Sequence, residues 1–212
     1  MKPAPPMTGD GWEEVFGANS HNQKGWLETL TIQTGGRFQW WRNVVVDNRY
    51  GGKTETGLPD YGVLFGGMTH WIECKHESDS ASMRIGRLKA DIGPDGRPLK
   101  VDKGVKPAQA EQMDRFLLAG PTVCCWVAAR LEVNAATLRK ASQVRLDGTG
   151  GDMPPVICRL VPWSTWRALM ADAEDCRRRG QEPQASIPAA DLATMGWPCR
   201  NAAELLAAIR GS

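Results

Sequence analysis

A pair of adjacent glycines in the middle of an alternating run constrains the fold of this chain more than any other feature. The run "YGVLFGGMTHWIECK" covers residues 61–75, with Gly66 and Gly67 near its centre. Two glycines between two alternating stretches are typical of a β-hairpin with a two-residue turn. In the register that this turn sets, Asp60 lies opposite Glu73. Directly opposed residues have Cβ atoms roughly 4.5–5.5 Å apart on one face of the sheet.

The pairing of Asp60 with Glu73 needs an explanation, because two like charges directly opposed destabilise a sheet. It becomes favourable if a hard divalent cation such as Mg²⁺ lies between the carboxylates. Lys75 projects from the same face as Glu73, since alternate residues of a strand share a face. A lysine there can stabilise developing negative charge or position a water. The three residues predict a metal site suited to phosphodiester hydrolysis; the alternative is solvated side chains at strand ends.

Helices and strands alternate along the rest of the chain. A capping box of Ser20 and Gln23 predicts a helix that begins at Ser20 and ends at the Gly35-Gly36 pair. Further strands are expected at 37–46, 121–130 and 155–161, further helices at 107–120, 163–180 and 201–210, and a second hairpin about the Pro-Asp-Gly turn at 94–96. This order predicts an α/β fold with a mixed central sheet flanked by helices.

The domain organisation follows from local composition. Residues 1–19 are expected as a flexible lead-in, 20–180 as the main domain and 181–212 as a helical appendage. Residues 78–106 form a basic insertion with seven Lys or Arg residues against four Asp residues, a local net charge of +3. Such a segment can neutralise phosphates of DNA, or it can be a solvated surface loop. The expected DNA-binding residues are Arg84, Arg87, Lys89, Lys103 and Lys106.

Composition favours an intracellular enzyme or binding protein. No stretch approaches the roughly 18 apolar residues of a membrane span, and the N-terminal residues lack the apolar core of a secretory signal. The six cysteines form no CxxC pair, and no histidine lies at zinc-site spacing from them. They are therefore expected to be reduced, mostly as core residues. A cytoplasmic location is expected.

Three segments together resemble the PD-(D/E)XK nuclease superfamily. The sequence "PD" at 59–60 followed by "ECK" at 73–75 is similar to its signature. Upstream, "NQKGWLETL" carries Glu28 and looks like the GxxxE helix of RecU-type Holliday junction resolvases. Downstream, "PAQAEQMDRFLLAG" at 107–120 is similar to the Gln-bearing helix of the RecU-like and VRR-NUC-like branches. The resemblance covers residues 20–130 and implies a restriction-endonuclease-like core.

The resemblance also implies roles for individual residues. Mg²⁺, or Mn²⁺ in its place, would be bound by Asp60, Glu73, Glu28 and the backbone carbonyl of Cys74, while Lys75 would assist the attacking water. The alternative for Glu28 is an exposed helix residue paired with a lysine one turn earlier.

A glutamine of the downstream helix is expected to contact the lysine or the water near the metal. Gln109 is preferred for this role because of its spacing from Gly120. Gln112, one turn later, competes with it, and a plain surface glutamine is the alternative.

The expected function is therefore that of a metal-dependent DNA endonuclease. Branched DNA is the first choice of substrate, as in a Holliday junction resolvase. One departure is that RecU-type enzymes carry a long stalk before the Asp strand, where this chain has only "DNRYGGKTETG". The alternatives are a VRR-NUC-like or restriction-type nuclease on flap or duplex DNA, and a DNA-binding protein that keeps the fold without catalysis.

A homodimer is expected, because resolving a four-way junction takes two symmetric cuts. Apolar surface for it could come from Trp40 and Trp41 or from Trp163 and Trp166, although either pair could equally lie in the core.

Overall fold

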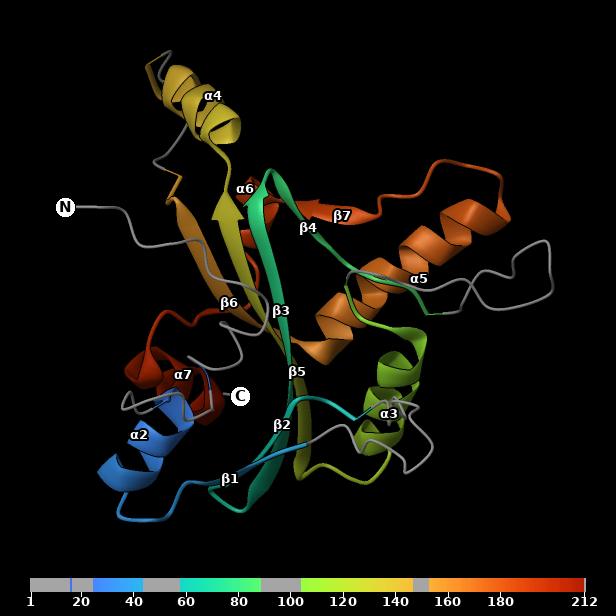
Figure 1. Cartoon of the computed structure of the whole chain (residues 1–212). Coiled ribbons are helices and arrows are strands. Elements are labelled where there is room, and N and C mark those ends of the chain that lie inside the picture. Colours follow the sequence, from blue (N-terminus) through green and yellow to red (C-terminus); the bar gives the residue numbers. More distant parts are fainter. Residues whose placement is uncertain (1–15, 17–24, 44–57, 89–103, 147–152, 212) are drawn as a thin grey trace, which may run out of the picture.

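A six-stranded sheet runs through the centre of the computed structural model (Figure 1), which describes residue 16 and residues 25–43, 58–88, 104–146 and 153–211. Its strand order is β1-β2-β3-β5-β6-β8. The strands are β1 (Gln39–Arg42), β2 (Tyr61–Phe65), β3 (Met68–Ser80), β5 (Val123–Val133), β6 (Val156–Pro162) and β8 (Trp197–Pro198). Because β3 and β5 are parallel while the other neighbours are antiparallel, the sheet is mixed. The predicted α/β architecture is confirmed.

The hairpin has the predicted register. Phe65 pairs with Met68, and the ladder continues to Tyr61, which pairs with Ile72. The two turn glycines at 66–67 have φ of 62° and 80°, a left-handed conformation that glycine adopts without strain. β3 then continues well beyond its partner, to Ser80, and this extension pairs with β5.

Helices cover both faces of the sheet, as Figure 1 shows. On one face lie α2 (Trp26–Gln33) and α7 (Ala202–Arg210); on the other lie α3 (Pro107–Leu117) and α5 (Trp163–Arg178). β3 supplies both cores, because its successive residues point to opposite faces. Ile72 and Cys74 pack in the α2/α7 core, while Trp71 lies against the α3/α5 core.

Several local structures were not predicted from the sequence, among them the two-residue strand β8. A separate two-stranded sheet pairs β4 (Ser82–Arg84) with β7 (Ser186–Pro188), which leads into α6 (Ala189–Leu192). A helix, α4 (Ala135–Leu146), follows β5 directly. The side chain of Asn134 accepts a hydrogen bond from the N–H of Thr137 at 2.8 Å and so caps this helix.

The first helix begins later than predicted. Gly25 has φ −61° and ψ 167°, an extended conformation, and α2 starts at Trp26. An unbroken helix from Ser20 is therefore wrong, because the backbone leaves helical geometry at Gly25; Ser20 and Gln23 lie outside the described residues. The predicted end at Gly35-Gly36 is confirmed, since both glycines have positive φ.

Other predictions fall partly outside the described residues. The strand expected at 37–46 is shorter, at Gln39–Arg42, and residues 44–46 are not described. The hairpin expected at 94–96 also lies outside the described residues. The strands expected at 121–130 and 155–161 and the helices expected at 107–120, 163–180 and 201–210 are all present.

The C-terminal residues join both sheets and the core. In the expected appendage 181–212, β7 pairs with β4, β8 pairs with β6, and α7 buries Leu205 and Ile209 in the same core as Leu27 of α2. All six cysteines are free, as predicted, and four of them are buried. None of the described helices has the length and apolar character to cross a membrane.

Trp163 and Trp166 do not provide a dimer surface. Both indoles are buried against the α3/α5 face of the sheet, and their ring N–H groups donate to Asp114 and to the carbonyl of Ile85. They are core residues. Trp41, in contrast, is 39 % exposed.

Candidate active site

Asp60 lies where the hairpin ladder ends. The last backbone pair of β2 and β3 joins Tyr61 to Ile72. One residue further, a carboxylate oxygen of Asp60 (Oδ2) accepts a hydrogen bond from the backbone N–H of Cys74 at 2.7 Å. The side chain thus binds the next part of β3 in place of a backbone group. This contact brings the Asp60 carboxylate to the strand segment that carries Glu73 and Lys75.

Glu73 is the buried centre of a small polar network. Glu73 is 0 % exposed, and its Oε1 lies 2.5 Å from the ammonium nitrogen of Lys75. The amide nitrogen of Gln109 donates to the same oxygen at 2.6 Å. The amide oxygen of Gln109 lies 3.5 Å from the Lys75 nitrogen. One carboxylate, one ammonium and one amide therefore hold each other in place.

Gln109 reaches this network because α3 is fixed at its first turn. Pro107 occupies the first helical position, which suits a residue without a backbone N–H. Gln109, two residues later, accepts a hydrogen bond from the backbone N–H of Lys106 at 3.0 Å. Ala110 and Met113 are buried in the core and hold this part of α3 against the sheet. The expected contact with Lys75 is present; for Gln112 no contact with the network is found among the described residues.

Burial and neighbouring charges shift the pKa values of Asp60 and Lys75. Burial, reinforced by the negative charge of Glu73, raises the pKa of Asp60 from 3.8 to about 7, while Lys75, the Cys74 N–H and Arg42 act in the opposite direction. Burial works against the charged form of Lys75, but the carboxylates of Glu73 and Asp60 outweigh it and raise the pKa of the ammonium. Lys75 therefore stays charged. A further positive charge nearby would stabilise the ionised form of Asp60.

Glu28 is not brought to this cluster. Its helix packs on the sheet face that buries Ile72 and Cys74, whereas Glu73 and Lys75 point to the α3 face. Across the described residues, no group of three or more His, Cys, Asp or Glu side chains is placed to hold a metal ion. The expectation that Glu28 lies beside Asp60 and Glu73 is not met, because α2 covers the opposite side of the sheet.

The basic insertion leaves and returns beside the site. Gly86 and Val105 form a bridge of parallel backbone segments, one residue before Lys106. A Cβ on Gly86 would lie 2.1 Å from the Val105 carbonyl oxygen, and one on Gly104 would lie 2.4 Å from the Gly86 nitrogen. Only glycines permit this approach. The two ends of the segment thus meet at the start of α3, where Gln109 binds Glu73.

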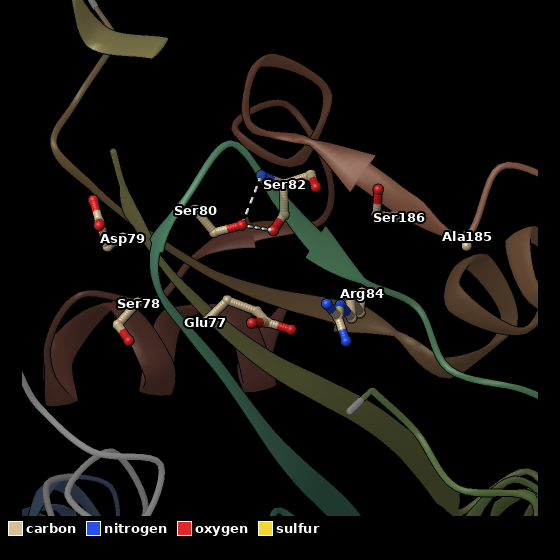
Figure 2. Close-up of a pocket in the computed structure, with 8 residues that line it drawn as sticks. All are labelled: Glu77, Ser78, Asp79, Ser80, Ser82, Arg84, Ala185 and Ser186. Atoms are coloured by element: carbon tan, nitrogen blue, oxygen red, sulfur yellow. Dashed lines mark hydrogen bonds between the residues drawn. The ribbon is translucent and has the colours of Figure 1, made fainter. Parts of the chain in front are cut away.

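The expected DNA-binding residues are placed in part. Arg84 is an exposed residue of β4, Arg87 is half-buried, and Lys106 precedes α3, whereas Lys89 and Lys103 lie outside the described residues. Arg84 lines a polar pocket of about 420 Å³ together with Glu77 of β3 (Figure 2). Glu77 follows Glu73 and Lys75 at alternate positions, so the pocket continues the same face of β3. Sequence reasoning missed it, although this spacing was the available signal.

Asp60 and Glu73 are oxygen donors of the kind that a hard divalent cation binds. Asp60 and Glu73 supply carboxylate oxygens, and the Cys74 carbonyl is a third candidate, which are the ligands that Mg²⁺ prefers. Burial, reinforced by the charge of Glu73, raises the pKa of Asp60, so both act against its ionised form. A cation between the carboxylates would act in the opposite direction. No protein-family model and no curated protein matches this sequence, so the geometry of Asp60, Glu73, Lys75 and Gln109 carries the functional argument.

Proposed function

We propose that this protein is a metal-dependent DNA endonuclease with a restriction-endonuclease-like core. The observation that carries the proposal is the convergence of Asp60, Glu73 and Lys75 at one end of the hairpin, with Gln109 bound to both Glu73 and Lys75. Two adjacent carboxylates and a charged lysine match what phosphodiester hydrolysis needs: cation ligands, and a positive group near the attacked phosphate.

Each residue has a distinct part in this proposal. Asp60, Glu73 and the Cys74 carbonyl would hold Mg²⁺ or Mn²⁺, which supplies Lewis acidity when bound. Lys75 orients the attacking water and stabilises negative charge on the phosphate. Gln109 holds the side chains of Lys75 and Glu73 in position, because its amide nitrogen donates to the carboxylate and its amide oxygen faces the ammonium.

Branched DNA is the proposed substrate, with resolution of Holliday junctions as the first choice. A VRR-NUC-like or restriction-type nuclease on flap or duplex DNA is the second candidate, favoured by the shortness of the segment in the stalk position. Incubation with Mg²⁺ and labelled junction, flap, duplex and single-stranded DNAs tests all of these. No cleavage of any of them, with binding retained, would favour a non-catalytic DNA-binding protein on the same fold.

The metal requirement has a signature in stability as well as in activity. Asp60 binds its proton more tightly in the folded than in the unfolded state, so its contribution to the free energy of unfolding falls as pH rises from about 4 to about 7, by up to about 1.4 kcal/mol per unit. Buried His70, whose pKa is lowered to about 4, contributes in the opposite direction. A divalent cation binds the ionised carboxylate, so Mg²⁺ is expected to raise Tm more above the pKa of Asp60 than below it. At an ion concentration 100 times Kd the gain is about 2.7 kcal/mol.

Thermal unfolding with and without Mg²⁺ across this pH range measures the effect. Asp60→Asn is the matched control, which should remove the part of the pH slope that Asp60 contributes and the response to the ion. In the cleavage assay Mn²⁺ should replace Mg²⁺, and Ca²⁺ should support binding only, since it accepts looser coordination. Full cleavage in excess EDTA would contradict the metal mechanism.

The basic insertion is expected to bind the DNA backbone. Reversing the charges of Arg84, Arg87 and Lys89 to Glu should weaken binding to all DNA sequences. It should also flatten the dependence of log Kd on log salt by up to about 0.9 for each phosphate that the variant no longer neutralises. The matched control reverses Arg177, Arg178 and Arg179, which pair with acidic residues of α5. An identical slope in both triple variants would show that the insertion makes no specific contribution.

A further inference from the structure

We infer that Trp41 is a stacking platform for an unpaired DNA base next to the scissile phosphate, so that the preferred substrate presents single-stranded DNA at the cleavage point. This inference rests on the proposed function for the nature of the polymer. It goes beyond it in assigning a binding residue and a substrate feature. Four properties of the indole support it: its exposure, the rings that hold it, its distance from Asp60 and the charge around it.

Trp41 is an exposed aromatic ring at the edge of an aromatic cluster. The indole is 39 % exposed, although most tryptophans of a folded domain are largely covered. Its inner side meets Trp71 edge-on, with ring centroids 5.5 Å apart and an interplanar angle of 88°. Trp71 in turn stacks on Phe116 of α3, at 4.2 Å and 7°. The indole is therefore held firmly on one side while part of its surface remains open to solvent.

Gly62 fixes where the indole lies. Trp41 of β1 pairs with Gly62 of β2, and a Cβ on Gly62 would lie 2.2 Å from the Trp41 ring. The ring thus occupies the space that any other side chain at position 62 would fill. A strand glycine commonly marks a close approach of another group. Here the approaching group is the indole, which lies against the strand rather than projecting freely.

This arrangement places the indole beside the candidate active site. Asp60 precedes Gly62 by two residues, which is about 7 Å along an extended chain. The same distance corresponds to about two base steps of nucleic acid at roughly 3.4 Å each. Both residues belong to the sheet face that carries Glu73 and Lys75. A strand whose phosphate lies at the carboxylates therefore brings a neighbouring base to Trp41.

The charge around Trp41 suits a nucleic acid. Arg42, the last residue of β1, is exposed and pairs with Tyr61, the neighbour of Asp60; its side chain leaves from the other face, at the edge of the sheet that Trp41 also occupies. An aromatic ring and a cation along one edge of a sheet are the groups with which proteins bind single strands, since every base has a π-face and every nucleotide a phosphate. A base in a continuous duplex is already stacked on both sides and cannot reach the ring. The geometry therefore selects an unpaired base.

The test measures binding separately from cleavage, with the full chain in Ca²⁺. The probe is an oligonucleotide with one 2-aminopurine, used as a single strand and as the same strand in a duplex. Trp41→Ala should weaken single-strand binding by about 5- to 150-fold and remove the quenching of 2-aminopurine, since stacking contributes that much per base. Duplex binding should change less than about 2-fold. Circular dichroism and Tm verify folding.

Two further variants guard against a loss of folding. Gly62→Ala keeps the indole but displaces it through the new Cβ, so it should reproduce the loss of single-strand binding. Ile32→Ala removes an exposed apolar side chain of α2, on the opposite face of the sheet, and should bind like the wild type. Together the three variants distinguish an effect of the position of the Trp41 ring on binding from an effect of losing any exposed apolar side chain.

Several results would overturn the platform. One is unchanged single-strand binding in both Trp41→Ala and Gly62→Ala. Another is a loss of duplex binding in Trp41→Ala equal to its loss of single-strand binding. A third is a change in light scattering from dimer to monomer with Kd unaffected, which would make this face an interface between copies. Failure of the nuclease proposal is distinguishable. A wild type that cuts no DNA in Mg²⁺, but whose single-strand binding depends on Trp41, would refute the nuclease and leave the platform standing.

Discussion

Asp60→Asn is expected to abolish DNA cleavage while leaving the affinity for uncleaved DNA nearly intact. The amide has the same size, and its oxygen can still accept the hydrogen bond from the Cys74 N–H. The variant removes one of two negative charges available to a divalent cation. A loss of about 4 kcal/mol of transition-state stabilisation corresponds to about a 1000-fold lower rate. Single-turnover cleavage of labelled junction and flap DNA measures it.

The matched control for this variant is Glu111→Gln. Glu111 is a carboxylate of α3 whose side chain is 65 % exposed and forms an ion pair with Arg115. Its replacement should leave the rate within about 2-fold of the wild type. Cleavage by Asp60→Asn at a rate like that of the control would refute the assignment of the site, because the hairpin carboxylate would then have no part in the chemistry.

Lys75→Met is expected to have the largest effect on stability of any change at this site. Glu73 is 0 % exposed, and its carboxylate faces the Lys75 ammonium at 2.5 Å. Removing one member of a buried ion pair typically costs about 3–5 kcal/mol, because the remaining charge stays in a poorly solvated place. Urea unfolding measures the change through its midpoint. The variant should also fail to cleave DNA, as should Lys75→Ala.

A double variant and an exposed pair serve as controls for this prediction. Glu73→Gln combined with Lys75→Met should recover most of the lost stability, because neither charge is then buried alone. Arg115→Met breaks an ion pair whose side chains are 65 % exposed on both sides, and such pairs contribute about 0–1 kcal/mol. An equal loss of unfolding free energy in Lys75→Met and Arg115→Met would mean that solvent screens the Glu73–Lys75 pair as it screens a surface pair.

The hairpin could be predicted residue by residue because two local rules agree on it. The glycine pair fixes the turn, and alternation fixes which side chains share a face. The register from Phe65 to Tyr61 follows, and with it the approach of Asp60 to the strand that carries Glu73. Gln109 was predicted on a different basis: the resemblance implies a Gln-bearing helix, and the spacing from Gly120 favoured Gln109 over Gln112.

The elements that were missed depend on contacts distant in sequence. β4 pairs with β7 across about a hundred residues, and neither strand has more than three residues, too few for a visible alternation. The side of the sheet that α2 covers is likewise a tertiary property. Leu27 and Leu30 predict that a face of α2 is buried, but not against which face of the sheet, and this left Glu28 wrongly placed beside Asp60.

The contact between Gly86 and Gly104 closes residues 87–103 of the insertion into a loop. Because the two ends already touch, the intervening chain closes a loop whose entropic cost grows by only about 0.6 kcal/mol for each doubling of its length. Longer, shorter or differently charged segments can therefore be exchanged there without disturbing Gln109 or Glu73. For the proposed nuclease, we expect that exchanging residues 87–103 would change the preferred DNA while Asp60, Glu73 and Lys75 stay in place.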